Sequence, residues 1–154
     1  MDTCHTCDLV AKRDSGEAPP WDNIHRTPRW DVVHCNATSL LGWLVLVTRR
    51  HVAALDELTA EEALELGQLI RETSIILKAL TGCAKTYVVQ FAEAPGHHHV
   101  HFHIIPRATD LPPEARGPRI FQHLGVSPED RLSDDVMNEF GQKVQQRLRD
   151  VLPQ

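Results

Sequence analysis

Three histidines alternate with apolar residues in the segment His99-Val100-His101-Phe102-His103-Ile104. Strict alternation is typical of a β-strand, because successive side chains on a strand point to opposite faces. The three imidazoles would then share one face, roughly 6.6 Å from one to the next, and the apolar side chains would face a core. Imidazole exchanges protons near neutral pH, ligates metals and acts as a nucleophile. The spacing therefore predicts a functional site on this strand. Ile105 breaks the alternation and Pro106 has no N–H for the ladder, so we expect the strand to end there.

A second group of reactive side chains lies near the start of the chain, where Cys4 and Cys7 are three residues apart. This spacing alone fits a redox pair, half of a zinc site or chance. A redox pair favours a position between a strand and a helix, which this segment does not supply. Zinc takes four ligands in a tetrahedron, so a zinc site here needs two more ligands from elsewhere in the chain.

Length and charge limit the classes of protein that the sequence fits. The 154 residues predict a single domain, 1–154. A net charge of −5 gives no basic face for duplex nucleic acid. No apolar run approaches ~18 residues, so we expect no membrane span. The first residues do not resemble a signal peptide, and the four cysteines then indicate free thiols or metal ligands in a cytoplasmic protein.

The rest of the chain predicts an α+β fold in which a sheet positions the histidines. Residues 59–80 have the features of a long helix, because Thr59 and Glu62 fit a capping box and Gly82 follows as a terminator. Residues 133–152 predict an amphipathic C-terminal helix. Residues 12–29 read as a loop with one short strand around 21–25. Further strands are predicted at 30–36, 43–47 and 84–91. The expected architecture is an antiparallel sheet of about five strands, covered by the long helix.

The sequence resembles the histidine triad (HIT) superfamily of nucleotide hydrolases and transferases, including its Hint-like and dinucleoside polyphosphate hydrolase-like members. The segment His-Val-His-Phe-His-Ile-Ile, from His99 to Ile105, fits the family signature. Residues 42–52 and 55–59 resemble the strand and turn before the family's long helix, and Cys4-His5-Thr6-Cys7 resembles the start of many members. The match covers most of residues 4–107, which implies that these residues form the core of the domain and that 108–154 add a cover and a helix. It implies a HIT-like fold and a homodimer.

The resemblance also implies roles for single residues. His101 matches the nucleophile that attacks an α-phosphorus and forms a nucleotidyl-histidine intermediate. His103 matches the residue that hydrogen-bonds the phosphate or the bridging oxygen, and His99 is the first histidine of the catalytic triad. Zinc-bearing relatives use two cysteines, a histidine after a basic pair and the first triad histidine. In this chain these ligands are Cys4, Cys7, His51 and His99.

The nucleotide pocket departs from the family pattern at several positions. Many members place Asp or Asn on the ribose, where this chain has Cys35, with Asn36 one residue further. Gln90 lies near a family asparagine, and Pro95-Gly96 replaces a Gln-Ser pair that contacts phosphate. Gly96 and His97 remain candidates for phosphate contact, so we expect the nucleotide to meet Asn36, Gln90, Gly96 and His97. Trp43 stands where relatives often have histidine, and we interpret it as a core or dimer aromatic.

Three hypotheses for function follow. The first is an enzyme, a nucleotide hydrolase or nucleotidyl transferase with a structural zinc ion and a nucleotide or dinucleoside polyphosphate as substrate. The second is a catalytically weak nucleotide-binding protein of the same fold, suggested by Cys35 and Pro95-Gly96. The third is a histidine-rich metal-binding protein, in which His97, His99, His101 and His103 chelate one or more ions.

Overall fold

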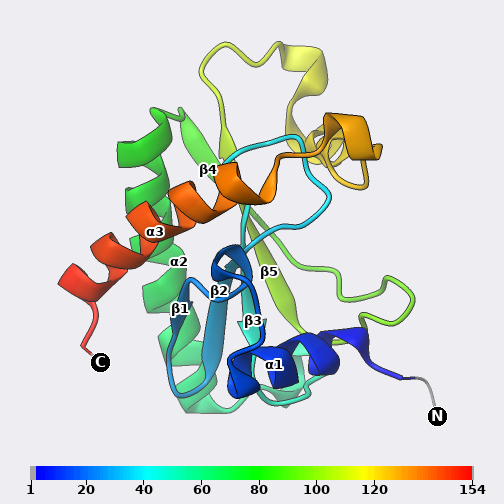
Figure 1. The fold of residues 1–154 in the computed structure, drawn as a ribbon, viewed down its shortest axis with the longest axis vertical. Helices are drawn as coiled ribbons and strands as arrows, with labels where there is room; N and C mark the ends of the chain where they lie inside the picture. The colour runs from blue at the N-terminus through cyan, green and yellow to red at the C-terminus, as the bar shows by residue number, and fades with distance from the viewer. Residues whose placement is uncertain (1–2, 154) are drawn as a thin grey trace.

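A five-stranded antiparallel sheet forms the centre of the protein. The computed structural model describes residues 3–153, and the strands follow one another across the sheet in the order β1-β2-β3-β5-β4. Their bounds are β1 His25–Arg26, β2 Trp30–His34, β3 Leu44–Thr48, β4 Lys85–Val89 and β5 His101–Arg107. The helices are α1 His5–Ser15, α2 Ala60–Thr81 and α3 Asp134–Val151, with short 3-10 turns between several elements. Figure 1 shows α2 and α3 on one side of the sheet. The predicted α+β class is confirmed, with an antiparallel sheet of five strands, one long covering helix and a C-terminal helix.

Helix α2 begins and ends where its sequence predicts. The Thr59 hydroxyl accepts a hydrogen bond from the Glu62 N–H, and the Glu62 carboxylate accepts one from the Thr59 N–H, which completes the capping box. Gly82 ends the helix in the left-handed conformation, at φ +68°. The predicted apolar stripe is narrower than expected, because Leu64 is 76% exposed. No helix among residues 3–153 combines the length and the apolar character that crossing a membrane would require.

Each face of the sheet has its own apolar core. Val100 and Ile104 are buried beside Leu46, Leu69 and Leu77 on the face covered by α2 and α3, as the alternation in 99–104 predicts. The opposite face has a second core, which includes Val10, Val33, Trp43, Val45, Ile105 and Ile120. Helix α1 and the segment around Ile120 contribute to this second core. The histidines of β5 lie on this second face.

Strand β5 begins two residues later than predicted and also extends past its predicted end. It begins at His101 rather than His99, because β3 ends at Thr48 and Val100 pairs with the backbone of Thr48 and Val52 instead. It also continues through Pro106 to Arg107, so the predicted end was wrong. Beyond Ile104 the register pairs β5 with β4 alone. A proline is tolerated there, since only one neighbouring strand needs its N–H groups.

Helix α1 was not predicted. Its last residues fall in the segment 12–29 that read as a loop, and residues 4–7 were considered only as a pair of cysteines. The Cys4 side chain caps the helix by accepting from the Cys7 N–H, and Gly16 closes it at φ +78°. The loop therefore begins only after Ser15. The short strand expected around 21–25 is a 3-10 turn at Pro20–Asp22 followed by the two-residue strand β1.

Candidate active site

The registers of the sheet place two of the triad histidines in rows with residues of β3 and β2. Residues directly opposite one another on neighbouring strands point to the same face. One row contains His101, Val47 and Asp31, and the next contains His103, Val45 and Val33. Each row therefore begins at a histidine of β5, crosses a valine of β3 and ends at a residue of β2.

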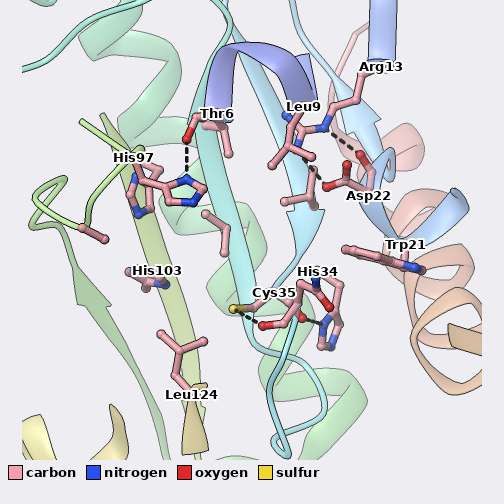
Figure 2. A pocket seen from close by; sticks show the side chains of 16 residues that line it. Thr6, Leu9, Arg13, Trp21, Asp22, His34, Cys35, His97, His103 and Leu124 are labelled. Atoms are coloured by element: carbon pink, nitrogen blue, oxygen red, sulfur yellow. Dashed lines mark hydrogen bonds and ion pairs between the residues drawn. The ribbon is translucent and has the colours of Figure 1, made fainter. Parts of the chain in front are cut away.

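A cavity of about 340 Å³ lies over these rows. Helix α1, the turn at Pro20–Asp22 and the loop before β5 complete its walls. Figure 2 shows His97 and His103 on one side of the cavity and Arg13 and Asp22 on the other. The side chains that line it are Thr6, Leu9, Arg13, Trp21, Asp22, Val33, His34, Cys35, Asn36, Val45, Val47, Ala94, His97, His101, His103 and Leu124.

Hydrogen bonding fixes the tautomer of His101. Its Nδ1 lies 2.7 Å from the backbone carbonyl oxygen of His99. A carbonyl oxygen can only accept, so Nδ1 carries the proton and donates it. In the neutral ring, Nε2 is then left with a free lone pair. His101 lines the cavity with the nitrogen that a nucleophile requires.

His103 has the opposite tautomer because of Trp43. The indole Nε1–H of Trp43, which can only donate, lies 2.9 Å from Nδ1 of His103. Nδ1 therefore accepts, and the proton of the neutral ring sits on Nε2. Desolvation, with a smaller effect of the charge on His101, lowers the pKa of His103 to about 4. At neutral pH this ring is an uncharged donor, and its centroid is 5.1 Å from that of His101.

Trp43 therefore does more than the core aromatic that the sequence suggested. It is fully buried and also packs edge-on against His103 and Phe121. A buried tryptophan needs an acceptor for its N–H, and this requirement was the signal in the sequence that could have revealed the contact.

His97 completes the histidine side of the cavity. Its Nδ1 lies 2.9 Å from the hydroxyl of Thr6 on α1, which is buried. Desolvation and, to a smaller extent, the charges of His101 and His5 lower the pKa of His97. His98 is exposed and does not line the cavity.

The four expected zinc ligands lie together, beside the cavity rather than in it. Their donor atoms are all within 4.8 Å of one another. Nδ1 of His99 is 3.6 Å from the Cys4 sulfur, 3.5 Å from the Cys7 sulfur and 3.3 Å from Nδ1 of His51. With zinc–sulfur bonds of about 2.3 Å and zinc–nitrogen bonds of about 2.0–2.1 Å, a tetrahedral ion separates a sulfur from a nitrogen by roughly 3.5 Å and two nitrogens by roughly 3.3 Å. The geometry of this group is thus compatible with zinc.

The hydrogen bonds of His99 fit the same arrangement. Its Nε2 is 2.7 Å from the carbonyl oxygen of Thr48, so Nε2–H donates and Nδ1 keeps a lone pair for a metal. Desolvation raises the pKa of the Cys7 thiol to about 11, with a further contribution from Cys4, so a metal must displace its proton. Within residues 3–153, only His99 of the four histidines considered for chelation belongs to a group of potential metal ligands. The geometry therefore does not favour the histidine-rich metalloprotein hypothesis.

The structure separates the four residues expected to meet a nucleotide. Asn36 and His97 line the cavity, whereas Gln90 and Gly96 do not. Gly96 instead approaches α1, where its carbonyl accepts from the His5 N–H at 2.8 Å. At φ +78°, a Cβ on residue 96 would overlap the His5 ring. Cys35 lines the cavity as an uncharged thiol, because burial raises its pKa to about 12.

A buried ion-pair network on the far wall was not predicted. Arg13 donates to the Asp22 carboxylate at 2.8 Å and to the Asp31 carboxylate at 3.3 Å. Arg26 also donates to Asp31, at 2.7 Å. Desolvation raises the pKa of Asp22, and the hydrogen bond from Arg13 opposes this effect. Arg13, Asp22 and Arg26 lie in the segment 12–29 that the sequence suggested was mostly loop, and Asp31 lies on the predicted strand 30–36, so no local pattern indicated that these charges would be buried together.

Comparisons with known proteins find likeness in the structure but not in the sequence. No protein-family model matches the chain, and no curated protein matches it with significance. A hypothetical histidine triad nucleotide-binding protein from Sulfolobus tokodaii superposes with a TM-score of 0.68 at 13% identity, over 94% of this chain and 93% of that one. A zinc-bound histidine triad protein from Mycobacterium smegmatis gives 0.65 at 15% identity, over 96% and 94%. The diadenosine triphosphate hydrolase of Plasmodium falciparum, in complex with cyclomarin A, gives 0.62 at 19% identity, over 83% and 76%. The chain therefore has the fold of the histidine triad proteins, as the motif on β5 predicted.

Proposed function

We propose that the protein is a nucleotide hydrolase or nucleotidyl transferase that acts at an α-phosphate through a nucleotidyl-His101 intermediate. The arrangement of His101 and His103 is the observation that supports this proposal. One ring lines the cavity with a free Nε2 lone pair, and its neighbour offers an Nε2–H. Among the structurally similar proteins are a nucleotide-binding protein and a diadenosine triphosphate hydrolase, which agree with this chemistry.

The reaction divides into two displacements. In the first, Nε2 of His101 forms a bond to the α-phosphorus while the bond from phosphorus to the leaving oxygen breaks, and the leaving group keeps that electron pair. The Nε2–H of His103 donates to a phosphate oxygen or to the leaving oxygen and stabilises the developing charge. In the second, water or another acceptor attacks phosphorus, loses a proton to the medium and releases His101.

We include one structural zinc ion, bound by Cys4, Cys7, His51 and His99, in the proposal. The distances within this group match a tetrahedral ion, and the similar protein from Mycobacterium smegmatis is zinc-bound. The ion would fix the start of α1 against the loop before β5. The four free cysteines are typical of a reducing compartment, which agrees with a cytoplasmic protein.

A homodimer is the proposed assembly. Strand β4 lies at an edge of the sheet. Val88 on this strand is 42% exposed, and Phe91, two residues after its end, is 63% exposed. An unpaired strand edge with exposed apolar side chains favours association with a second copy. Light scattering should give twice the mass of one chain, and the mass of a single chain at micromolar concentration would contradict this assembly.

Intact-protein mass spectrometry tests the covalent step. The protein is mixed with a panel of adenylated and guanylated substrates, quenched without acid, and compared with His101→Ala. We expect the wild type alone to gain the mass of one nucleotide, and turnover to be lost in a folded variant. His98→Ala, at an exposed histidine of the neighbouring loop, is the matched control and should behave as wild type.

The catalytically weak binding protein remains the second candidate, because the cavity presents the neutral thiol of Cys35 and neither Gln90 nor Gly96 lines it. Nucleotide binding without an adduct or product from any substrate would favour it and overturn the enzymatic proposal.

A further inference from the structure

The wall opposite the histidines holds a carboxylate that the proposed reaction does not use. The Asp22 side chain is only 7% exposed, yet it lines the cavity. Arg13, whose side chain is 1% exposed, donates to Oδ1 and to the backbone carbonyl of Asp22, both at 2.8 Å. Among the hydrogen bonds of residues 3–153, none reaches Oδ2 of Asp22. Arg13 therefore holds the carboxylate in place before any ligand binds. The carboxylate can still accept hydrogen bonds from a ligand.

The position of Asp22 fits one part of a nucleotide. His101, Val47 and Asp31 form one row across β5, β3 and β2, so Asp31 lies roughly 10 Å from His101 at the usual spacing of strands. Arg13 bridges Asp31 and Asp22, which places Asp22 at that far end of the cavity. Figure 2 shows Asp22 on the side opposite His97 and His103. This separation suits the length from an α-phosphate to a nucleobase and exceeds that to the ribose hydroxyls.

The surface between the two ends is apolar. Val33, Val45 and Val47 form the floor of the cavity, and Leu9 of α1 contributes to the opposite wall. A flat aromatic base can bury both faces against such side chains. Its edge must then be recognised by polar groups at the end of the cavity.

The chemistry of a carboxylate discriminates among the four common bases. An ionised carboxylate only accepts hydrogen bonds. Guanine presents two adjacent donors, N1–H and the N2 amino group, on its Watson–Crick edge. Adenine and cytosine place an acceptor nitrogen beside their amino group, and uracil places its single N–H between two carbonyl oxygens. Only guanine can satisfy the carboxylate with two neighbouring donors and no repulsion.

We propose that Asp22 recognises the base of the bound nucleotide and selects guanine, so that the substrates are guanylated compounds. This inference rests on the proposed function of the same cavity. Arg13 acts as a positioning residue, because its donors hold the Asp22 carboxylate and peptide in the orientation that meets the base.

Equilibrium binding of GMP, IMP and AMP to the full chain with its metal tests the inference. GMP should bind roughly 10- to 100-fold more tightly than AMP, since a hydrogen bond to a charged group contributes this much when its loss leaves the group unpaired. IMP, which lacks the N2 amino group, should bind with intermediate affinity. Asp22→Asn should reduce the preference for GMP over AMP to less than about threefold. Asp56→Asn, the same change at an exposed carboxylate, should leave it unchanged.

The outcomes separate this inference from the function on which it rests. Equal binding of GMP and AMP to the wild type would overturn guanine selection while leaving a nucleotide site in place. No binding of any of the three would overturn the proposed function and this inference together. The comparison of ligands uses only the wild type, so it stays decisive even when Asp22→Asn fails to fold.

Discussion

The chemistry of this site depends on which nitrogen of each imidazole holds a proton. One hydrogen-bond partner determines the tautomer of each ring. The partner is the His99 carbonyl for His101, the Thr48 carbonyl for His99 and the Trp43 indole N–H for His103. The first two are backbone carbonyls, which any residue type supplies. The third is a side chain, so Trp43 is the position where a substitution can change the tautomer.

Replacing Trp43 with phenylalanine should lower kcat about 10- to 100-fold, because His103 loses the donor that keeps its proton on Nε2. The hydrogen bond from Trp43 also opposes protonation of Nδ1, so its loss should move the acid limb of the kcat profile to higher pH. Steady-state kinetics from pH 4 to 8 measure both effects.

Trp30→Phe is the matched control for this prediction. Trp30 is also fully buried, and its Nε1–H donates to the Glu62 carbonyl at 2.9 Å on the helix-covered side. Trp30→Phe should lower the free energy of unfolding by a similar amount without moving the acid limb of the kcat profile. A folded Trp43→Phe protein with wild-type kcat and pH profile would show that Trp43 only fills space.

At the scale of elements, the proposed zinc ion joins three segments. Its ligands come from the start of α1, the residues after β3 and the residues before β5. Helix α1 contributes Thr6, Leu9 and Arg13 to the cavity, so we expect metal binding to influence the shape of the proposed nucleotide site.

Chelation should therefore lower Tm by roughly 10 °C and weaken nucleotide binding, since a tightly bound ion stabilises only the folded state. Cys7→Ser should reproduce both effects and reduce the metal content from one ion per chain. Cys83→Ser, at a buried cysteine outside the group, should retain its metal and its response to chelation. Metal analysis and thermal unfolding make the measurement, and an unchanged Tm after complete metal removal would contradict the role of the ion.

The sequence predicts those elements whose signals are local. The alternation from His99 to Ile104 identifies the triad strand, and Thr59 with Glu62 identifies the start of α2, because the groups that interact are near one another in the chain. Helix α1 gave no such signal, since its residues have no strong apolar stripe and its end at Gly16 resembles a loop. The Arg13–Asp22 pair and the Trp43–His103 contact also escaped prediction. Their partners are 9 and 60 residues apart, and only the assembled fold brings them together.

At the scale of the whole molecule, both faces of the sheet are covered, and each face has a buried histidine. His103 is buried on the face with the cavity, and His34 is buried on the helix-covered face, where it packs against Phe140. Desolvation is the main cause that lowers the pKa of both. His34 also donates from Nδ1 to the Cys35 carbonyl and accepts the Gly42 N–H at Nε2, which requires a neutral ring.

This burial predicts how stability depends on pH. The unfolded chain binds protons at histidines with a pKa near ~6.5, whereas the folded chain holds His103 neutral down to about 4. The unfolded state therefore binds more protons in this window, so the free energy of unfolding is highest above pH ~6.5 and falls as the pH drops towards 4. From pH 7 to pH 5, His103 alone should lower the free energy of unfolding by about 2 kcal/mol.

Urea unfolding measures this decrease, and the use of chelated protein excludes effects of metal release. His103→Asn should remove the part of the decrease that His103 causes, whereas His98→Asn, at an exposed histidine, should not. An equal decrease in wild type and His103→Asn would mean that the folded protein protonates His103 as readily as the unfolded chain does, and that the ring is not the neutral donor proposed for the reaction.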